Sequence, residues 1–216
     1  MTALATGAEL RVTGTGAVTV ICVDGGTRDL LPGTWSASVE WLVRRLAPRL
    51  PELAFAEVRY HIKSWQRLDL CEADARAALD GVQAGRALVL GFSMGGAVGV
   101  RVADDVRVGG IVGVNPWLPD ALDLSALRGK VLSAIHGSLD RALPGIPGVS
   151  PELSRRAVER ARALGADASH TLVPGALHAV ALRSPWGSAL PMPRAGRIAD
   201  LVAGELRRLA LRSEDP

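Results

Sequence analysis

Residues 86–99 read RALVLGFSMGGAVG, and this stretch decides the fold class of the chain. The unbroken apolar run at 87–90 is typical of a strand buried on both faces of a parallel sheet. It leads directly into Gly91-Phe92-Ser93-Met94-Gly95, and small residues suited to a tightly packed helix follow. A G-x-S-x-G turn between a strand and a helix is the pattern of a nucleophile elbow, which exposes a serine hydroxyl. The alternative interpretation is a glycine-rich turn whose serine caps the next helix.

Strand and helix patterns alternate on both sides of this stretch. Apolar runs rich in β-branched residues predict strands, and apolar residues spaced three or four apart predict helices. This alternation predicts a doubly wound, mainly parallel α/β sheet with helices on both faces. No repeat or interdomain linker interrupts it, so one domain is expected over residues 1–216. The expected strands are residues 9–13, 17–23, 53–60, 87–90, 108–114, 130–136 and 169–173; the expected helices are 35–46, 68–82, 150–164 and a C-terminal stretch through Leu209, with 174–193 irregular.

The composition is that of an ordinary globular protein. Hydrophobic residues make up 48% and charged residues 22% of the 216 residues, enough for one full core. The net charge is only +3 and the arginines are scattered, which favours a solvated surface over a nucleic-acid-binding patch. The N-terminal residues lack the features of a secretory signal, and no apolar run is long enough to span a bilayer. We therefore expect a cytoplasmic protein with no nucleic-acid or membrane partner and two buried, reduced cysteines, Cys22 and Cys71. Its oligomeric state stays open.

Ser93 needs partners to act as a nucleophile. A serine hydroxyl is a weak nucleophile unless a base accepts its proton and a third group orients that base. His61, His136 and His170 lie within or at the ends of expected strands, where packing roles suit them better. His178 instead follows the last expected strand, at the carboxyl edge of the sheet, where open α/β sheets bind ligands. His178 is therefore the expected base.

Asp140 is the expected orienting acid. It comes four residues after His136 and so lies at the same edge of the sheet. Asp120 and Asp123, which follow the preceding strand, are alternative acids, and a plain turn aspartate is the alternative role for Asp140. Since the three chosen residues all follow separate parallel strands, their side chains are able to converge.

Acyl chemistry at Ser93 also requires hydrogen-bond donors for an oxyanion. The backbone N–H of Met94 is one expected donor, and the loop at 24–27 supplies the other. Gly26 is the first choice in that loop and Thr27 the second, while a plain Gly-Gly turn is the alternative interpretation. No metal-ligand spacing, phosphate loop or dinucleotide fingerprint occurs, because the Gly14-Thr15-Gly16 run precedes its strand instead of following it.

Together these motifs resemble the α/β-hydrolase superfamily, in particular its small, lidless bacterial esterases and thioesterase-like members. The resemblance covers nearly the whole chain from residue 18 and is strongest in the runs Gly91-Phe92-Ser93-Met94-Gly95-Gly96, His136-Gly137-Ser138-Leu139-Asp140 and Gly175-Ala176-Leu177-His178. It implies a Ser93-Asp140-His178 triad, in the chain order of that fold, and no cofactor. One departure is the Asp24-Gly25 pair, where the family usually has His-Gly supporting the oxyanion loop.

The connection between two expected strands bears on the substrate. Residues 115–129 are too few for a large cap domain, so an open site is expected. Its expected walls are Thr27, Trp117, Leu139, Leu143 and Trp186. Such a site suits hydrolysis of a small carboxylic ester or thioester through an acyl-enzyme. The alternatives are a non-catalytic ligand-binding protein of the same fold, or an acyltransferase or perhydrolase that uses the same residues.

Overall fold

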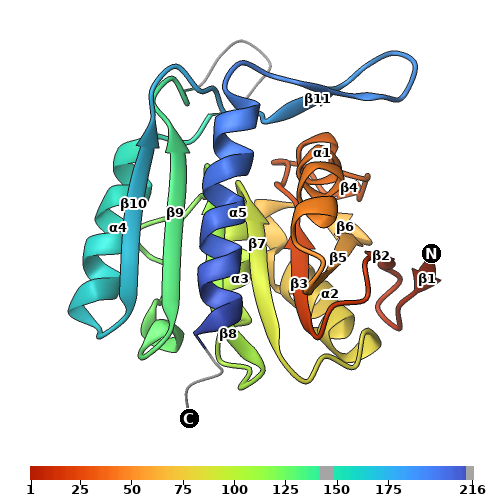
Figure 1. Ribbon diagram of the computed structural model, residues 1–216, viewed down its shortest axis with the longest axis horizontal. Helices are drawn as coiled ribbons and strands as arrows, with labels where there is room; N and C mark the ends of the chain where they lie inside the picture. Colours follow the sequence, from red (N-terminus) through yellow and green to blue (C-terminus); the bar gives the residue numbers. More distant parts are fainter. Residues whose placement is uncertain (142–147, 213–216) are drawn as a thin grey trace.

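A computed structural model describes residues 1–141 and 148–212, whose strands form one main sheet (Figure 1). The sheet has the order β1-β2-β5-β3-β7-β8-β9-β10. The last six strands in this order, β5-β3-β7-β8-β9-β10, run parallel to one another. At the other edge, β1 pairs antiparallel with β2, and β2 pairs antiparallel with β5. This confirms the predicted fold class. The strands are β1 (Thr2–Ala3), β2 (Glu9–Thr13), β3 (Val18–Val23), β5 (Leu53–Arg59), β7 (Ala87–Phe92), β8 (Val108–Val114), β9 (Val131–Gly137) and β10 (Asp167–Val173).

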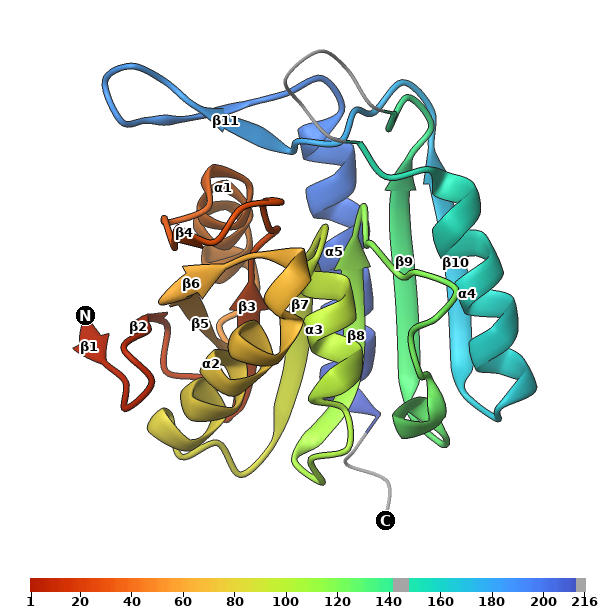
Figure 2. The same cartoon turned by 180° about the vertical axis from the view of Figure 1, so that it is seen from behind.

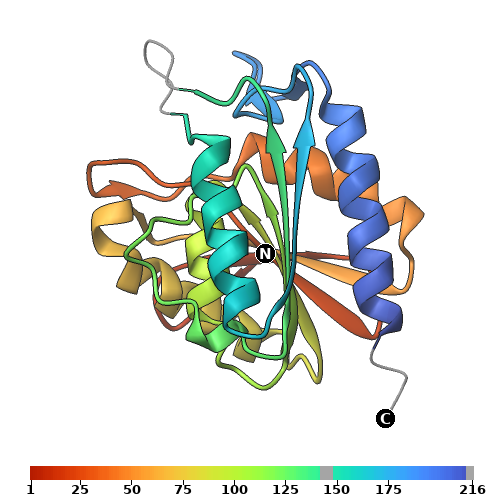
Figure 3. The ribbon, with the colours of Figure 1, turned by 90° about the vertical axis from the view of Figure 1, so that its left-hand side faces the viewer.

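Helices cover both faces of the sheet, as the edge-on view in Figure 3 makes plain. On one face lie α1 (Ala37–Leu46) and α5 (Ala195–Leu211); on the other lie α2 (Leu68–Gly81), α3 (Gly95–Arg101) and α4 (Pro151–Ala163) (Figure 2). Serine side chains cap the N-termini of two of these helices. Ser36 accepts a hydrogen bond from the Val39 N–H at the start of α1, and Ser150 accepts one from the Glu152 N–H at the start of α4.

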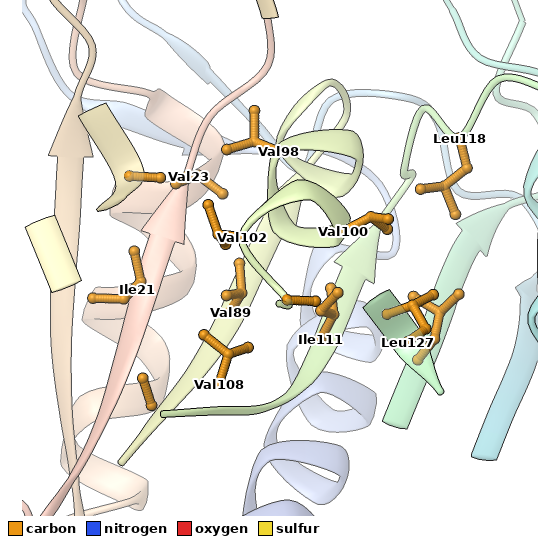
Figure 4. Packing of buried hydrophobic residues seen from close by; sticks show 14 of the residues in the cluster. Ile21, Val23, Val89, Val98, Val100, Val102, Val108, Ile111, Leu118 and Leu127 are labelled. Atoms are coloured by element: carbon orange, nitrogen blue, oxygen red, sulfur yellow. The ribbon is translucent and has the colours of Figure 1, made fainter. Parts of the chain in front are cut away.

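Alternate residues of the central strands enter two separate hydrophobic layers. In β7, Val89 packs toward α2 and α3, whereas Leu88 and Leu90 pack toward α1 and α5. Figure 4 shows the first layer, in which Ile21, Val89 and Ile111 from three adjacent strands meet the side chains of α3. This two-sided burial explains why the strands read as continuous apolar runs.

The strand order reverses direction between β3 and β7. The chain passes from β3 outward to β5 and then returns to add β7 on the other side of β3. β3 and β7 stay paired to the end of β3, but the connections after them lead away in opposite directions, which makes their carboxyl ends a topological switch point, where open α/β sheets bind ligands. Residue 24 and Ser93 follow these two ends directly.

The segment at 174–193 differs from the prediction of an irregular loop. It contains a short antiparallel hairpin of β11 (Ala181–Arg183) and β12 (Ala189–Pro191) that projects beside α1 (Figure 1). Each strand has only three residues, too few to display a period of two in the sequence. A second small sheet of β4 (Leu31–Pro32) and β6 (Ile62–Lys63) was missed for the same reason.

The connection from β8 to β9 carries only one short 3-10 turn, η3 (Ser125–Leu127), so no large cap domain is inserted there. Among the helices of the described ranges, none has the length and apolar character needed to cross a membrane.

Candidate active site

Ser93 occupies a strained turn directly after β7. Its φ angle is +53°, in the left-handed region that non-glycine residues rarely adopt. A Cβ atom on Gly91 would lie 2.4 Å from the Gly95 carbonyl oxygen, and one on Gly95 would lie 2.4 Å from the Val23 carbonyl oxygen. Since both obstacles are backbone atoms, only glycine fits at either position. The turn thus has the geometry that the G-x-S-x-G pattern predicts.

Both backbone groups of Ser93 are hydrogen-bonded to the neighbouring strand connection. Its N–H donates to the Val114 carbonyl at 3.0 Å, and its carbonyl accepts from the Trp117 N–H at 2.8 Å and from the Gly96 N–H at 2.9 Å. These bonds help to keep the residue in its strained conformation.

A continuous line of hydrogen bonds joins the three predicted site residues. The Ser93 Oγ atom lies 3.1 Å from His178 Nε2, and His178 Nδ1 lies 2.8 Å from Asp140 Oδ2. The other carboxylate oxygen of Asp140 accepts from the Val149 N–H at 2.8 Å. The His178 side chain is 12% exposed and that of Asp140 is fully buried, so solvent reaches the imidazole ring but not the carboxylate.

Asp140 is held in its charged form. Burial opposes the charge, but hydrogen bonds from His136 and His178 outweigh burial and lower the pKa of Asp140 below its ordinary value. A carboxylate in this state stabilises an imidazolium on the neighbouring ring.

Asn115 links the loops that carry Asp140 and His178. Its Oδ1 atom accepts from the Gly137 N–H at 2.8 Å, and its Nδ2 atom donates to the carbonyls of Leu177 and His178. The two loops also touch directly, because a Cβ on Gly137 would lie 2.5 Å from the Ala176 carbonyl oxygen. Asp140 and His178 are thereby fixed relative to each other. Asn115 was not predicted as a site residue, although its place at the end of β8 was visible in the sequence.

The glycine loop after β3 lies against the elbow. A Cβ on Gly25 would be 3.1 Å from Ser93 Cβ, and one on Gly26 would be 2.3 Å from Met94 Sδ. In the described part of the chain, no hydrogen bond uses the backbone N–H of Gly26 or of Met94. The loop and the elbow thus each place beside the serine one N–H group that has no hydrogen-bond partner among the described residues.

The side chain of Asp24 ties this loop to neighbouring elements of the fold. It is buried, and burial raises the pKa of its carboxyl above the ordinary value, against the opposing effects of Lys63, the Ser36 hydroxyl and the Gly25 N–H. Lys63 Nζ lies 3.7 Å from Asp24 Oδ2. The carboxylate thus connects the loop to the start of α1 and to β6.

Two depressions flank the His178 ring. The first has a volume of about 410 Å³, opens over Ser93 and has mostly apolar walls. The second, of about 450 Å³, lies on the other side of Phe92 and His178 and extends toward α1 and the β11–β12 hairpin. The walls of the first come chiefly from Trp65, Phe92, Met94, Trp117 and Val149, with Lys63, Gly148 and the 24–26 loop completing it.

Several predicted walls lie elsewhere. Thr27 directs its hydroxyl to two carbonyl oxygens, that of Asp29 in its own loop at 2.9 Å and that of Lys63 in β6 at 2.8 Å. Leu139 is 41% exposed, and Trp186, in the turn between β11 and β12, is 88% exposed; like Thr27, neither lines the depression over Ser93. These three assignments are corrected, because the directions of loop side chains do not follow from strand order. Leu143 lies outside the described residues.

Trp65, Lys63 and Val149 were not predicted as walls. Trp65 begins a 3-10 turn, η2 (Trp65–Arg67), shortly after β6, and that strand is too short to be detected in the sequence.

The alternative acids lie away from the site: Asp120 pairs with Arg156 at the surface, and Asp123 accepts a hydrogen bond from Ser125 in its own turn. Across residues 1–141 and 148–212, no cluster of three or more His, Cys, Asp or Glu side chains is arranged to hold a metal ion.

Comparisons with known proteins agree with this architecture. No protein-family model and no curated protein matches the sequence. A serine hydrolase homologue from Coxiella burnetii superposes with a TM-score of 0.68 at 19% identity, covering 92% of this chain and 91% of its own. A putative α/β hydrolase from Agrobacterium tumefaciens gives 0.69 at 17% identity, covering 95% and 93%. A monoacylglycerol lipase from Paleococcus ferrophilus gives 0.67 at 13% identity, covering 94% and 99%. The chain therefore has the α/β-hydrolase fold.

Proposed function

We propose that this protein is a serine hydrolase that cleaves a small carboxylic ester or thioester. The observation that carries the proposal is the hydrogen-bonded line from the Ser93 hydroxyl through His178 to the buried Asp140, with Ser93 on a turn at positive φ. Nucleophile, base and orienting acid are the three roles that acyl transfer by serine requires.

The reaction begins with the Ser93 hydroxyl. Its oxygen attacks the acyl carbon while His178 Nε2, 3.1 Å away, takes the proton. Asp140 stabilises the imidazolium that forms and keeps Nδ1–H directed toward itself. His178 then returns the proton to the leaving alcohol or thiol, which leaves an acyl group on Ser93. In the second half, water attacks the acyl-enzyme with His178 again as base.

The oxyanion of each tetrahedral intermediate is stabilised by the N–H groups of Met94 and Gly26. The first follows the nucleophile directly, and the second lies across from it on the glycine loop that contacts Met94. Preorganised donors of this kind account for a large part of the rate enhancement in acyl transfer.

The two depressions suggest how a substrate is oriented. A leaving group must lie near His178 Nε2 to receive its proton, and we assign it to the depression of about 450 Å³ that His178 shares with the start of α1. The acyl group then occupies the depression of about 410 Å³ bounded by Trp65 and Trp117. A pocket of this size, without a cap domain over it, favours a short or single-ring acyl group over a long lipid chain.

Labelling with a fluorophosphonate, followed by intact-protein mass measurement, tests the proposal. One adduct is expected on the parent protein, none on Ser93→Ala, and strongly slowed labelling on His178→Ala. Ser125→Ala, which changes an exposed serine away from the site, is the matched control and is expected to label at the parent rate. Absence of an adduct on folded parent protein would contradict the proposal and favour a non-catalytic ligand-binding role.

Hydrolysis of p-nitrophenyl acetate and of an acetyl thioester, with product analysis in the presence of added alcohol, then separates esterase, thioesterase and acyltransferase activities.

A further inference from the structure

Asp140 is bonded to two imidazole rings, not one. His136 Nε2 lies 2.9 Å from Asp140 Oδ2, the same oxygen that lies 2.8 Å from His178 Nδ1. His136 comes from β9 and is completely buried. The reaction proposed above uses only His178, so the second ring has no role in it yet.

The neighbours of His136 determine where its protons lie. Nε2 is also 3.0 Å from the Val149 carbonyl oxygen, which can only accept, so Nε2 carries a proton and donates to both oxygens. Nδ1 lies 2.7 Å from Ser154 Oγ. That hydroxyl has one proton and two other neighbours at 3.0 Å, the Pro151 carbonyl and His170 Nε2. The Ser154 hydroxyl donates to the Pro151 carbonyl, and the Val149 carbonyl fixes His136 as an Nε2–H donor toward Asp140.

His170 lies at the outer end of this network. Burial lowers the pKa of His170, with smaller contributions from His136 and from Arg155 of α4. Its Nε2 atom lies 3.0 Å from Ser154 Oγ. Asp140 therefore has His136 on one side and His178 on the other.

Ser154 is not a second nucleophile, although Ser154, His136 and Asp140 form a line like that of the proposed triad. Ser154 is completely buried within α4 and does not line the depression over Ser93. Its hydroxyl serves to hold the His136 ring.

We infer that His136 is a positioning residue for the reaction proposed above, which this inference presupposes: its Nε2–H holds Asp140 Oδ2 in place and disperses part of the carboxylate charge. Because His136 Nε2–H donates to it, the Asp140 carboxylate stays directed at His178 Nδ1 while the imidazolium forms. The shared oxygen also attracts the proton on His178 less strongly than a carboxylate with one imidazole partner.

Two substitutions of His136 separate this role from packing. His136→Gln keeps an N–H donor near the place of Nε2, whereas His136→Met fills similar volume without a donor. Ser133→Ala is the matched control, since Ser133 is a buried polar residue on the opposite face of the same strand, bonded to Glu205. Each protein is assayed for kcat and KM with p-nitrophenyl acetate, and the pKa of the His178 ring is followed by NMR.

The donor role gives a specific set of results. His136→Met is expected to lower kcat roughly 10- to 100-fold, the effect of one hydrogen bond to a charged group, and to raise the pKa of His178. KM stays within about twofold, because no substrate contact is lost. His136→Gln is expected to recover most of kcat and the parent pKa, and Ser133→Ala to match the parent.

Equal losses in the Gln and Met variants, or parent values in His136→Met, would overturn the inference. If His136→Met does not fold, Ser154→Ala decides, because it releases Nδ1 and must lower kcat and raise the pKa of His178 if the ring is held as described; no change would overturn it. If the parent protein itself lacks hydrolase activity, the proposed function fails, while the NMR comparison still decides whether His136 acts on His178 through Asp140.

Discussion

Replacing Gly26 by alanine tests the oxyanion site with little damage to the fold. The new Cβ would lie 2.3 Å from Met94 Sδ and 3.0 Å from Met94 Cε. Ordinary carbon contacts lie at about 3.5–4.0 Å, so Met94 Sδ and the new methyl group must separate by roughly 1 Å. Both obstacles belong to the end of a flexible side chain, which can turn away without moving its backbone. The next neighbour, the Trp65 N atom at 3.3 Å, needs only a small adjustment.

The expected magnitudes follow from that geometry. Overpacking next to Met94, which is only 1% exposed, costs about 1 kcal/mol of unfolding free energy and about 2–4 °C in melting temperature. Catalysis suffers more, because any part of the roughly 1 Å separation that the Met94 side chain does not absorb moves the Gly26 N–H away from the oxyanion. Loss of one such donor lowers kcat by about 100- to 1000-fold, so we expect a loss of roughly 100-fold with KM little changed.

The assay is p-nitrophenyl acetate hydrolysis alongside thermal unfolding followed by circular dichroism. Gly204→Ala, at an exposed position of α5 with open space around it, is the control and is expected to retain kcat and gain about 1 kcal/mol. Gly95→Ala is the contrasting variant: its Cβ would meet two backbone oxygens, those of Val23 and Asp24, so stability and activity fall together.

Parent-like kcat in Gly26→Ala would refute the assignment of Gly26 as an oxyanion donor. A melting temperature as low as that of Gly95→Ala would refute the argument that Met94 yields to the new methyl group.

Three further results are expected. Burial raises the pKa of Asp24, so the ionisation of Asp24 opposes folding once the pH exceeds the ordinary aspartate range. Asp24→Asn should therefore raise the melting temperature at neutral pH and lose this advantage in acid. An equal effect of the substitution at both pH values would contradict the buried charge. Ser150→Ala removes the N-cap of α4 and should cost about 1 kcal/mol, measured by denaturant unfolding; an unchanged midpoint would mean that the cap contributes nothing. Trp117→Ala enlarges the depression over Ser93 and should raise the hexanoate-to-acetate ratio of kcat/KM about tenfold, whereas Leu139→Ala, outside the depression, should leave this ratio as it is.

The alternation of buried strands and amphipathic helices was enough to predict seven of the eight strands of the main sheet, all but the two-residue β1. Strands such as β8 are apolar throughout because they are covered on both faces, and this signal depends only on local sequence. The β11–β12 hairpin could not be predicted, since three-residue strands stabilised by contacts with α1 leave no periodic pattern. The small sheet of β4 and β6, with two residues in each strand, could not be predicted for the same reason.

The convergence of Ser93, Asp140 and His178 followed from one topological rule, that parallel strands end at a common edge. The walls of the depression did not follow from that rule. Val149 reaches the site because its N–H is bonded to Asp140, and Trp65 because its N–H is bonded to the Thr27 carbonyl. Such contacts depend on loop conformations that strand order leaves open.

The hydrogen bond from the Trp117 N–H to the Ser93 carbonyl divides the β8–β9 connection into two parts with different tolerance for change. Residues up to the fully buried Leu118 support the nucleophile and cannot be lengthened without disturbing it. At Asp120 itself the chain is exposed, and its ion pair with Arg156 at the surface contributes little to stability, while Leu124 and Leu127 further on are buried. Extra chain can therefore be inserted at Asp120, three residues from a wall of the depression, without altering the elbow. Selectivity for longer or bulkier acyl groups is thus open to engineering, and to evolution, by insertion at this point while the reacting residues stay unchanged.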